Sequence, residues 1–467
     1  MPASERPWDL GGRARRAARP ARLLAKGATA AALAQARVLR GDSVEAIASD
    51  RRLVAAAEDI ARELGEMKGA AMKIGQALSI LDVGLIPEEY RTALSVLQSD
   101  APPMPYEAVR EVVSQELGAP PEELFDFFSP RPMAAASIGQ VHMAHRGDEE
   151  LVVKVQYPGI ADAVAADLRN AALLSGIARL LQRMTAGLAG DIDVRALIDE
   201  VRDRVTDELD YRIEAANQRE FAELFAGDPE IGIPSVCEEL STRRVLTSGY
   251  VDAMRWSAAL GQPAELRNRW GGVISRFSAT SVYDHGTVNV DSHPGNYLFH
   301  EDGRVTFLDF GCVTRLTEEQ RVRLRRLGAA LVSGDRDAVL DTFVEAGFLR
   351  TRSGFDPEAL LGPLSSWVQA ARGPQPFHYS REMLADIVAE AMRVRVGVDE
   401  LKLLQRLDVP REFVLLGRVS VGLEAILAHL EATIDFRELY ARHLAGAVDV
   451  EPRWPDASDA DASGGVA

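Results

Sequence analysis

The sequence is poor in cysteine and contains no long uncharged apolar segment. Its two cysteines, Cys237 and Cys312, are too few for a disulfide framework or a four-cysteine zinc site, which favours a reducing cytosol. No run of about eighteen residues is apolar throughout, and the best candidate, Phe413 to Leu430, is interrupted by Arg418 and Glu424. We therefore expect a cytoplasmic protein without a transmembrane helix.

Basic residues are outnumbered by acidic ones over the chain as a whole. The 467 residues include 53 Lys and Arg against 70 Asp and Glu, which is a net charge of −17 at pH 7. A nucleic-acid-binding protein needs a basic face against phosphate, so we expect no nucleic-acid partner. Hydrophobic residues at 47% and charged residues at 26% are typical of globular proteins, and the length suits two or three domains.

The N-terminal segment reverses this charge balance. Residues 1–40 contain nine Lys or Arg against Glu5 and Asp9, so nine positive minus two negative charges leave a local net charge of +7. Two interpretations stay open. The favoured one is a solvated, partly disordered leader. The other is a segment that contacts anionic lipid weakly and holds the protein peripherally at the inner face of a membrane.

Hydrophobic periodicity places helices on both sides of a strand-rich middle. Apolar residues from Leu53 to Leu78 recur at three- and four-residue steps, which predicts a helix. Leu151 to Gln156 alternates like a strand, and Glu301-Asp-Gly-Arg304 between two apolar segments predicts a β-hairpin. Together these patterns predict an α+β fold with helical extensions. Further helices are expected at about 194–225 and 317–444, and further strands at 233–237 and 244–247.

The segment after Asn289 carries the strongest chemical signal. Asp291 is followed five residues later by Asn296, then by the hairpin and by Asp309-Phe-Gly. Phosphoryl transfer requires a carboxylate that orients the proton of the nucleophile, and oxygen ligands for Mg²⁺ on the triphosphate. This order, that of the catalytic half of a protein-kinase-like fold, predicts Asp291 as the catalytic carboxylate and Asn296 and Asp309 as metal ligands. The alternative is a turn-rich loop with Asx caps.

The upstream half contains a candidate phosphate loop, a strand lysine and a helix glutamate. Glu214 shares one helix face with Asp210, Asn217 and Phe221, because the four positions are spaced by 4, 3 and 4 residues. A carboxylate buried on such a face needs a cationic partner, so we predict that Lys154 pairs with Glu214 and assists catalysis at the ATP phosphates. Taken singly, each is a solvated side chain. The predicted nucleotide-binding residues are Ala134, Ala135, Ala136, Ser137, Ile138, Gly139, Gln140, Lys154 and Glu214.

Four stretches together make the chain similar to a known family. They are Lys73-Ile-Gly-Gln76, Ala134 to His142, Glu208 to Asn217, and Asp291 to Asn296 with Asp309 to Gly311. The chain resembles the AarF/UbiB family of atypical, protein-kinase-like kinases, which is linked to isoprenoid-quinone metabolism and lipid homeostasis. The similarity covers about residues 50–345.

The resemblance implies a bilobal protein-kinase-like fold that binds ATP with Mg²⁺ and either hydrolyses ATP slowly or transfers its phosphoryl group. It implies ATP and ADP as ligands, an isoprenoid or lipid as a further ligand, and a gate in which Lys73 and Gln76 restrain the active site and Lys73 meets Glu208 or Asp210. The expected parts are a basic leader (1–45), an N-terminal helical extension (46–130), a kinase-like N-lobe with inserted helices (131–250), a C-lobe (251–345), a C-terminal helical region (346–448) and a disordered tail (449–467).

Two positions near Asp291 depart from the family pattern, and a third departure lies in the linker after the fifth strand, which reads Thr247-Ser-Gly-Tyr250 where the family more often has Met-Glu. Asn289 stands where the family usually has His, and Ser292 stands where it usually has Pro, which puts the scaffold of the catalytic loop in question. A non-catalytic pseudokinase that binds a lipid or a protein is therefore the alternative function. An antibiotic or small-metabolite phosphotransferase is a second rival, against which the motif at Lys73 argues. We expect no metal site at His285 and His293, because no third soft ligand accompanies them.

Overall fold

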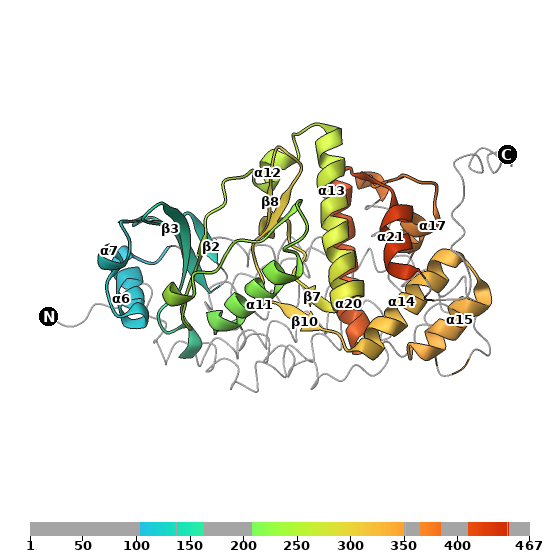
Figure 1. Ribbon diagram of the computed structural model, residues 1–467, viewed down its shortest axis with the longest axis horizontal. Helices are drawn as coiled ribbons and strands as arrows, with labels where there is room; N and C mark the ends of the chain where they lie inside the picture. The colour runs from blue at the N-terminus through green and yellow to red at the C-terminus, as the bar shows by residue number, and fades with distance from the viewer. Residues whose placement is uncertain are drawn as a thin grey trace, which may run out of the picture. The chain divides into compact units, whose positions relative to one another are not determined.

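The computed structural model describes residues 103–136, 138–162, 208–349, 365–383 and 410–445, together with residues 351 and 447, and every structural statement concerns this part of the chain. The chain falls into two compact units, Met1–Ala216 with Ser235–Tyr250 and Asn217–Pro234 with Val251–Ala467. Helices and sheets occur in both units (Figure 1), so the predicted α+β class is confirmed. The basic leader, the helix predicted from Leu53 to Leu78 and the C-terminal tail lie outside the described residues.

The first unit contains a five-stranded antiparallel sheet. The strands are β1 (Phe127–Phe128), β2 (Ala134–Ala136), β3 (Gly139–Arg146), β4 (Glu149–Gln156) and β6 (Val245–Gly249). The order is β1-β3-β4-β6, with β2 paired to β3. Leu151, Val153 and Val155 of β4 pack in one buried cluster with residues of α6 (Tyr106–Leu117), so the predicted strand at this place is confirmed. The described part of the unit also contains two short helices, α7 (Pro121–Leu124) and the 3₁₀ helix η2 (Glu238–Leu240).

Helix α11 (Tyr211–Leu224) begins later than the sequence predicts. Glu208 and Leu209 form a turn, and Oδ1 of Asp210 accepts the backbone N–H of Arg212 at 3.1 Å. A short acidic side chain in this position satisfies an N–H group that has no partner within the helix. The prediction that the helix runs through these residues is therefore wrong, and Asp210 does not share the helix face of Glu214.

The second unit is built around helix α13 (Ala264–Ala279) and the hairpin of β8 (Tyr297–Phe299) and β9 (Val305–Phe307). The rings of Phe277 on α13 and Phe307 on β9 stack with their centroids 3.8 Å apart. Gly303 in the turn has a φ of 92°, a conformation that glycine adopts without steric strain. The predicted hairpin is therefore confirmed, and its strands are anchored in the core of the unit.

The other elements of the second unit surround this core, and Figure 1 shows α20 alongside α13. The remaining strands are β5 (Ile231–Gly232), parallel to β9; β7 (Thr287–Asn289), antiparallel to β10 (Val313–Arg315); and β11 (Phe377–His378), antiparallel to β12 (Thr433–Ile434). The remaining helices are α12 (Trp256–Ala259), the π-helix η3 (Thr280–His285), the 3₁₀ helix η4 (Pro294–Asn296), α14 (Glu318–Ser333), α15 (Arg336–Glu345), α17 (Ser365–Arg372), α20 (Arg411–Leu430) and α21 (Phe436–Leu444).

Two predicted elements need correction. The region from 317 to 444 is not helical throughout, because β11 and β12 form a small sheet. The strand predicted at 233–237 is wrong, since β5 ends at Gly232 and Val236 makes only an isolated bridge to Ser248. Pro234 lacks a backbone N–H, so a regular ladder does not extend through it. Within the described ranges, no helix has the length and apolar character needed to cross a membrane.

A buried polar network joins the strand β3 to the segment before α6. The Nε2 group of Gln140 lies 2.9 Å from Nε2 of His142, and Oε1 of Gln140 accepts the N–H of Met104 at 2.9 Å. Nδ1 of His142 lies 2.8 Å from the carbonyl oxygen of Ser129. With a carbonyl at one ring nitrogen and an amide donor at the other, this arrangement fits the neutral imidazole.

We predict that His142 makes the protein less stable in mild acid. Burial lowers the pKa of the His142 imidazole below its usual value, so the unfolded chain takes up a proton at a higher pH than the folded one. The free energy of unfolding therefore falls as the pH drops through the unfolded-state pKa of about 6.5, by at most about 1.4 kcal/mol per pH unit. Urea unfolding across this range should show a steeper loss for wild type than for His142→Gln. Equal slopes would contradict the prediction.

Candidate active site

The structure brings Lys154 and Glu214 together within the first unit. The Nζ atom of Lys154, on β4, lies 2.9 Å from both carboxylate oxygens of Glu214, in the first turn of α11. Their side chains are 17% and 8% exposed, and Nζ also lies 5.1 Å from the ring centroid of Tyr211. A carboxylate in this environment needs the cation beside it, because burial of an unpaired charge is strongly unfavourable.

The alanine-rich segment forms a strand pair. Ala134, Ala135 and Ala136 of β2 pair with Val141, Gln140 and Gly139 of β3. A Cβ atom on Gly139 would lie 2.2 Å from the carbonyl oxygen of Val155, so glycine is required here by the close approach of β4. Ser137, which the sequence analysis includes in this loop, lies outside the described residues.

The side chains of Gln140 and Ile138 have structural surroundings that the sequence analysis did not foresee. Gln140 is 1% exposed and its amide is hydrogen-bonded to Met104 and close to His142. Ile138 is 3% exposed, and its carbonyl oxygen accepts the N–H of Tyr157. The Gln140 side chain therefore has a role in the packing of the first unit, and its contact with a nucleotide stays a prediction.

In the second unit, the hairpin brings the three predicted catalytic and metal-binding residues close together. Nδ2 of Asn296 donates to Oδ2 of Asp291 at 2.9 Å. The N–H of Leu308 donates to the carbonyl oxygen of Asn296 at 3.0 Å, which places the following residue, Asp309, beside the same loop. Oδ1 of Asp309 accepts the N–H of Gly311 at 2.9 Å. The loop that carries Asp291 and the segment that carries Asp309 therefore lie side by side, because the hairpin of β8 and β9 brings the chain back to this loop.

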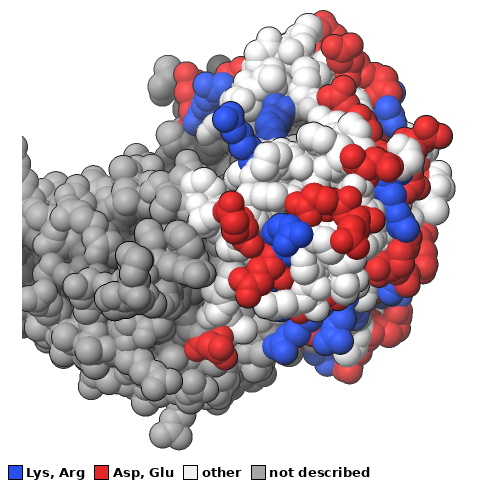
Figure 2. All heavy atoms as spheres, turned by 90° about the vertical axis from the view of Figure 1, so that its left-hand side faces the viewer, with Lys and Arg blue, Asp and Glu red and all other residues white. Residues whose placement is uncertain are grey.

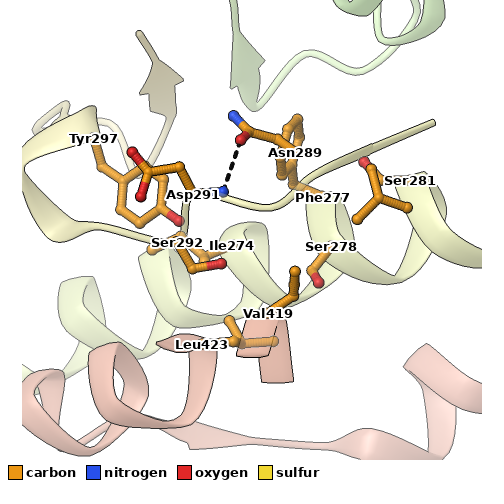
Figure 3. A pocket seen from close by; sticks show the side chains of 11 residues that line it. Ile274, Phe277, Ser278, Ser281, Asn289, Asp291, Ser292, Tyr297, Val419 and Leu423 are labelled. Carbon is orange, nitrogen blue, oxygen red and sulfur yellow. Dashed lines mark hydrogen bonds between the residues drawn. The ribbon is translucent and has the colours of Figure 1, made fainter. Parts of the chain in front are cut away.

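Asn289 ties the loop that carries Asp291 to the Asp-Phe-Gly segment. Its Nδ2 group donates to the carbonyl oxygen of Asp309 at 2.6 Å, and its Oδ1 atom accepts the N–H of Asp291 at 3.0 Å, the contact drawn in Figure 3. A side-chain amide donates and accepts at the same time. Asn289, which departs from the family pattern, therefore holds the two segments together. In the sequence, only its amide side chain indicated such a role.

The second half of α11 holds the Asp-Phe-Gly segment in a way that sequence reasoning missed. Nδ2 of Asn217 donates to the carbonyl oxygen of Phe310 at 2.9 Å, and its Oδ1 atom accepts from Arg315 at 2.9 Å. The rings of Phe221 and Phe310 lie with their centroids 4.9 Å apart. Asn217 and Phe221 both lie on the helix face that the residue spacing predicts. The spacing does not show that this face contacts the Asp-Phe-Gly segment.

The residues of the proposed gate are only partly described. Lys73 and Gln76 lie outside the described residues, so their contact with Glu208 or Asp210 stays a prediction. Glu208 is partly buried in the turn before α11. Oδ2 of Asp210 lies 2.6 Å from Nη2 of Arg212, and this hydrogen bond lowers the pKa of the Asp210 carboxyl.

The donor set fits Mg²⁺ better than a soft metal ion. No group of three or more His, Cys, Asp or Glu side chains with metal-binding geometry occurs in the described part of the chain. Nδ1 of His293 accepts the N–H of Gly295, and His285 packs edge-on against Phe225. Asn296 and Asp309 offer oxygen atoms, the ligands that Mg²⁺ prefers when phosphate and water complete its shell.

Replacing Lys154 by Met should destabilise the protein more than removing both charges. The single variant leaves the Glu214 carboxylate buried without its cation, and we expect the free energy of unfolding to fall by about 3 kcal/mol. Adding Glu214→Gln removes the buried charge and should recover more than half of this loss. Urea unfolding of wild type and both variants measures the effect, and equal stability of the single and double variants would contradict it.

Comparison with known proteins identifies the family. Residues 96–343 match the ABC1 atypical kinase-like domain. Over 283 residues the chain is 36% identical to the chloroplastic Activity of BC1 complex kinase 8 of Arabidopsis thaliana, covering 60% of this chain and 37% of that protein. Over 387 residues it is 31% identical to the mitochondrial atypical kinase COQ8B of Rattus norvegicus, covering 82% of this chain and 71% of that protein.

A solved structure supports the same conclusion. The complex of Rv3197 with erythromycin from Mycobacterium tuberculosis matches with a TM-score of 0.60 and 31% identity, over 82% of this chain and 94% of that chain. The chain spans 37% to 42% of the length of the first three curated relatives. The fold is therefore protein-kinase-like, and the chain belongs to the AarF/UbiB family of ABC1 atypical kinases.

Proposed function

We propose that this protein binds ATP with Mg²⁺ and either hydrolyses ATP slowly or transfers its phosphoryl group to an acceptor in isoprenoid-quinone or membrane-lipid metabolism. The observation that carries the proposal is the geometry around Asp291. Asn296 is hydrogen-bonded to the Asp291 carboxylate, and Asn289 links the backbone of Asp291 to that of Asp309. A carboxylate and two oxygen ligands held in fixed relation are the groups that phosphoryl transfer requires.

Each residue has a distinct task in this proposal. Asp291 orients the hydroxyl of the acceptor or the attacking water and receives its proton. Lys154, held by Glu214 at 2.9 Å, contacts the phosphates. Asn296 and Asp309 hold Mg²⁺, which when bound neutralises charge on the phosphate oxygens. The backbone of Ala134 to Ala136 borders the nucleotide, and Lys73 and Gln76 restrain access to it.

The alternative is a pseudokinase that binds nucleotide without turning it over. The departures at Asn289 and Ser292 first suggested it, and the two hydrogen bonds of Asn289 favour the enzyme because they maintain the loop scaffold. ATP turnover by the purified protein, with and without liposomes and with Asp291→Asn as control, separates the two functions. Mg-ATP binding without turnover in either condition would support the pseudokinase.

The metal assignment predicts that Mg-ATP stabilises wild type but not Asp309→Asn. A ligand at about 100 times its Kd adds about 2.7 kcal/mol to the free energy of unfolding, which appears as a rise in Tm. Asp302→Asn is the matched control, because Asp302 lies in the turn of the same hairpin, 56% exposed and paired with Arg304. Thermal unfolding with ATP, with and without Mg²⁺, should show the rise in wild type and Asp302→Asn only. A full rise in Asp309→Asn would refute the metal site.

Membrane contact in this proposal rests on residues 1–40. On the face shown in Figure 2, acidic and basic side chains are interspersed among the described residues. The candidate lipid contact is chosen for its local net charge of +7 in residues 1–40. Each basic residue near an anionic surface contributes on the order of 1 kcal/mol, screened by salt.

Neutralising part of this charge in the full-length protein should weaken binding to anionic vesicles. We expect co-sedimentation of wild type at low salt, its loss at high salt, and clearly reduced pelleting of the variant with Arg13, Arg15, Arg16 and Arg19 changed to Gln. Vesicles of neutral lipid serve as the control. Equal pelleting of variant and wild type on anionic vesicles would show that the segment is only a solvated leader.

A further inference from the structure

Helix α20 packs against the loop that carries Asp291, although it begins well over a hundred residues later in the chain. Val419 of α20 is 5% exposed and lies in one buried cluster with Val288 and Val290, the residues that lead into the loop. Figure 3 shows Val419 and Leu423 reaching from α20 toward Ser292. Because α20 lies outside residues 96–343, this support comes from beyond the segment that matches the kinase-like domain.

Helix α20 comes close to Ser292 at a glycine, Gly422. A Cβ atom on Gly422 would lie 2.8 Å from Cβ of Ser292 and 3.2 Å from its carbonyl oxygen. The carbon–carbon distance of 2.8 Å is too short, because the favourable separation of two carbon atoms is about 3.5 to 4.0 Å. Glycine inside a helix is about 1 kcal/mol less favourable than alanine, so its presence here is explained by the contact rather than by the helix.

Ser292 lines a small pocket of about 20 Å³ beside α13 and α20, together with Tyr297 and Leu423. The pocket has room for about one water molecule. The Tyr297 side chain lies beside Ser292 in this pocket (Figure 3). The contact with Gly422 is therefore a localised support, and a shift of Ser292 would be transmitted directly to its neighbour Asp291.

We propose that Gly422 is a positioning residue for the catalytic loop. Because it has no side chain, α20 comes close enough to hold Ser292, and this sets the direction of the Asp291 carboxylate against Asn289 and Asn296. The consequence for turnover rests on the proposed function, whereas the consequence for the loop does not. Catalysis is sensitive to such placement, since an error of about 1 Å can reduce a rate by about a hundredfold.

The test compares Gly422→Ala with Gly417→Ala on the same helix, where an added Cβ would meet nothing within 4 Å. Hydrogen exchange of the peptide covering residues 290–297 should be faster in Gly422→Ala and unchanged in Gly417→Ala. In ATP turnover, kcat of Gly422→Ala should fall by about tenfold or more while KM for Mg-ATP stays within about twofold, the pattern of a lost transition-state interaction. Combining Gly422→Ala with Ser292→Gly removes the 2.8 Å contact and should restore exchange and kcat toward the values of Ser292→Gly alone.

The outcomes separate the two proposals. Wild-type exchange in Gly422→Ala, or no recovery in the double variant, would overturn the positioning role. Absence of Mg-ATP turnover in wild type would defeat the enzymatic proposal, while the exchange experiment would still decide the role of Gly422. If Gly422→Ala does not fold, as judged by circular dichroism, the double variant decides: its folding supports the contact with Ser292, and its failure to fold refutes it.

Discussion

The amide of Asn289 is the contact on which the geometry of the candidate site depends. It donates to the carbonyl oxygen of Asp309 and accepts the N–H of Asp291, so one side chain sets the spacing between two segments. Both partners are backbone groups, and the contact therefore consumes neither carboxylate. The pairing of β7 with β10 and the hydrogen bond from Val290 to Cys312 continue the same alignment along the chain. An amide also has no titratable proton, so this link does not depend on pH.

Within each unit, the charged side chains of the candidate site that the structure describes have specific partners. The Glu214 carboxylate accepts a hydrogen bond from Lys154. The Asp291 carboxylate accepts one from the amide of Asn296, and the Asp309 carboxylate accepts one from the N–H of Gly311. Such partners are needed because a buried charge without them is strongly unfavourable. Two glycines allow backbone segments to pack closely. Gly139 lies against β4, and Gly422 lies against the loop that carries Asp291. The site is thus held by backbone proximity as much as by side chains.

The parts of the site that were predictable are those with a local or ordered signature. Asp291 and Asn296 are five residues apart, and the turn residues predict the hairpin between Asn296 and Asp309. The sequence therefore predicts that these three residues lie close together. Lys154 and Glu214 are 60 residues apart, and only their order relative to the other motifs predicted the pair. The packing partner of Gln140 was not predictable, because Met104 lies 36 residues earlier. Asp210 was placed on a helix that in fact begins after it.

By itself, the sequence determined the chemical groups, their order along the chain and the α+β class, because periodicity and turn residues report local conformation directly. Tertiary structure alone decided which neighbours those groups meet: Met104 for Gln140, Phe310 for Asn217 and Gly422 for Ser292. The physical reason is that an amphipathic pattern shows which face of an element is buried but not what covers it. The covering element depends on the packing of distant segments such as α20. The spacing of residues in α20 does not predict that this helix contacts the loop that carries Asp291.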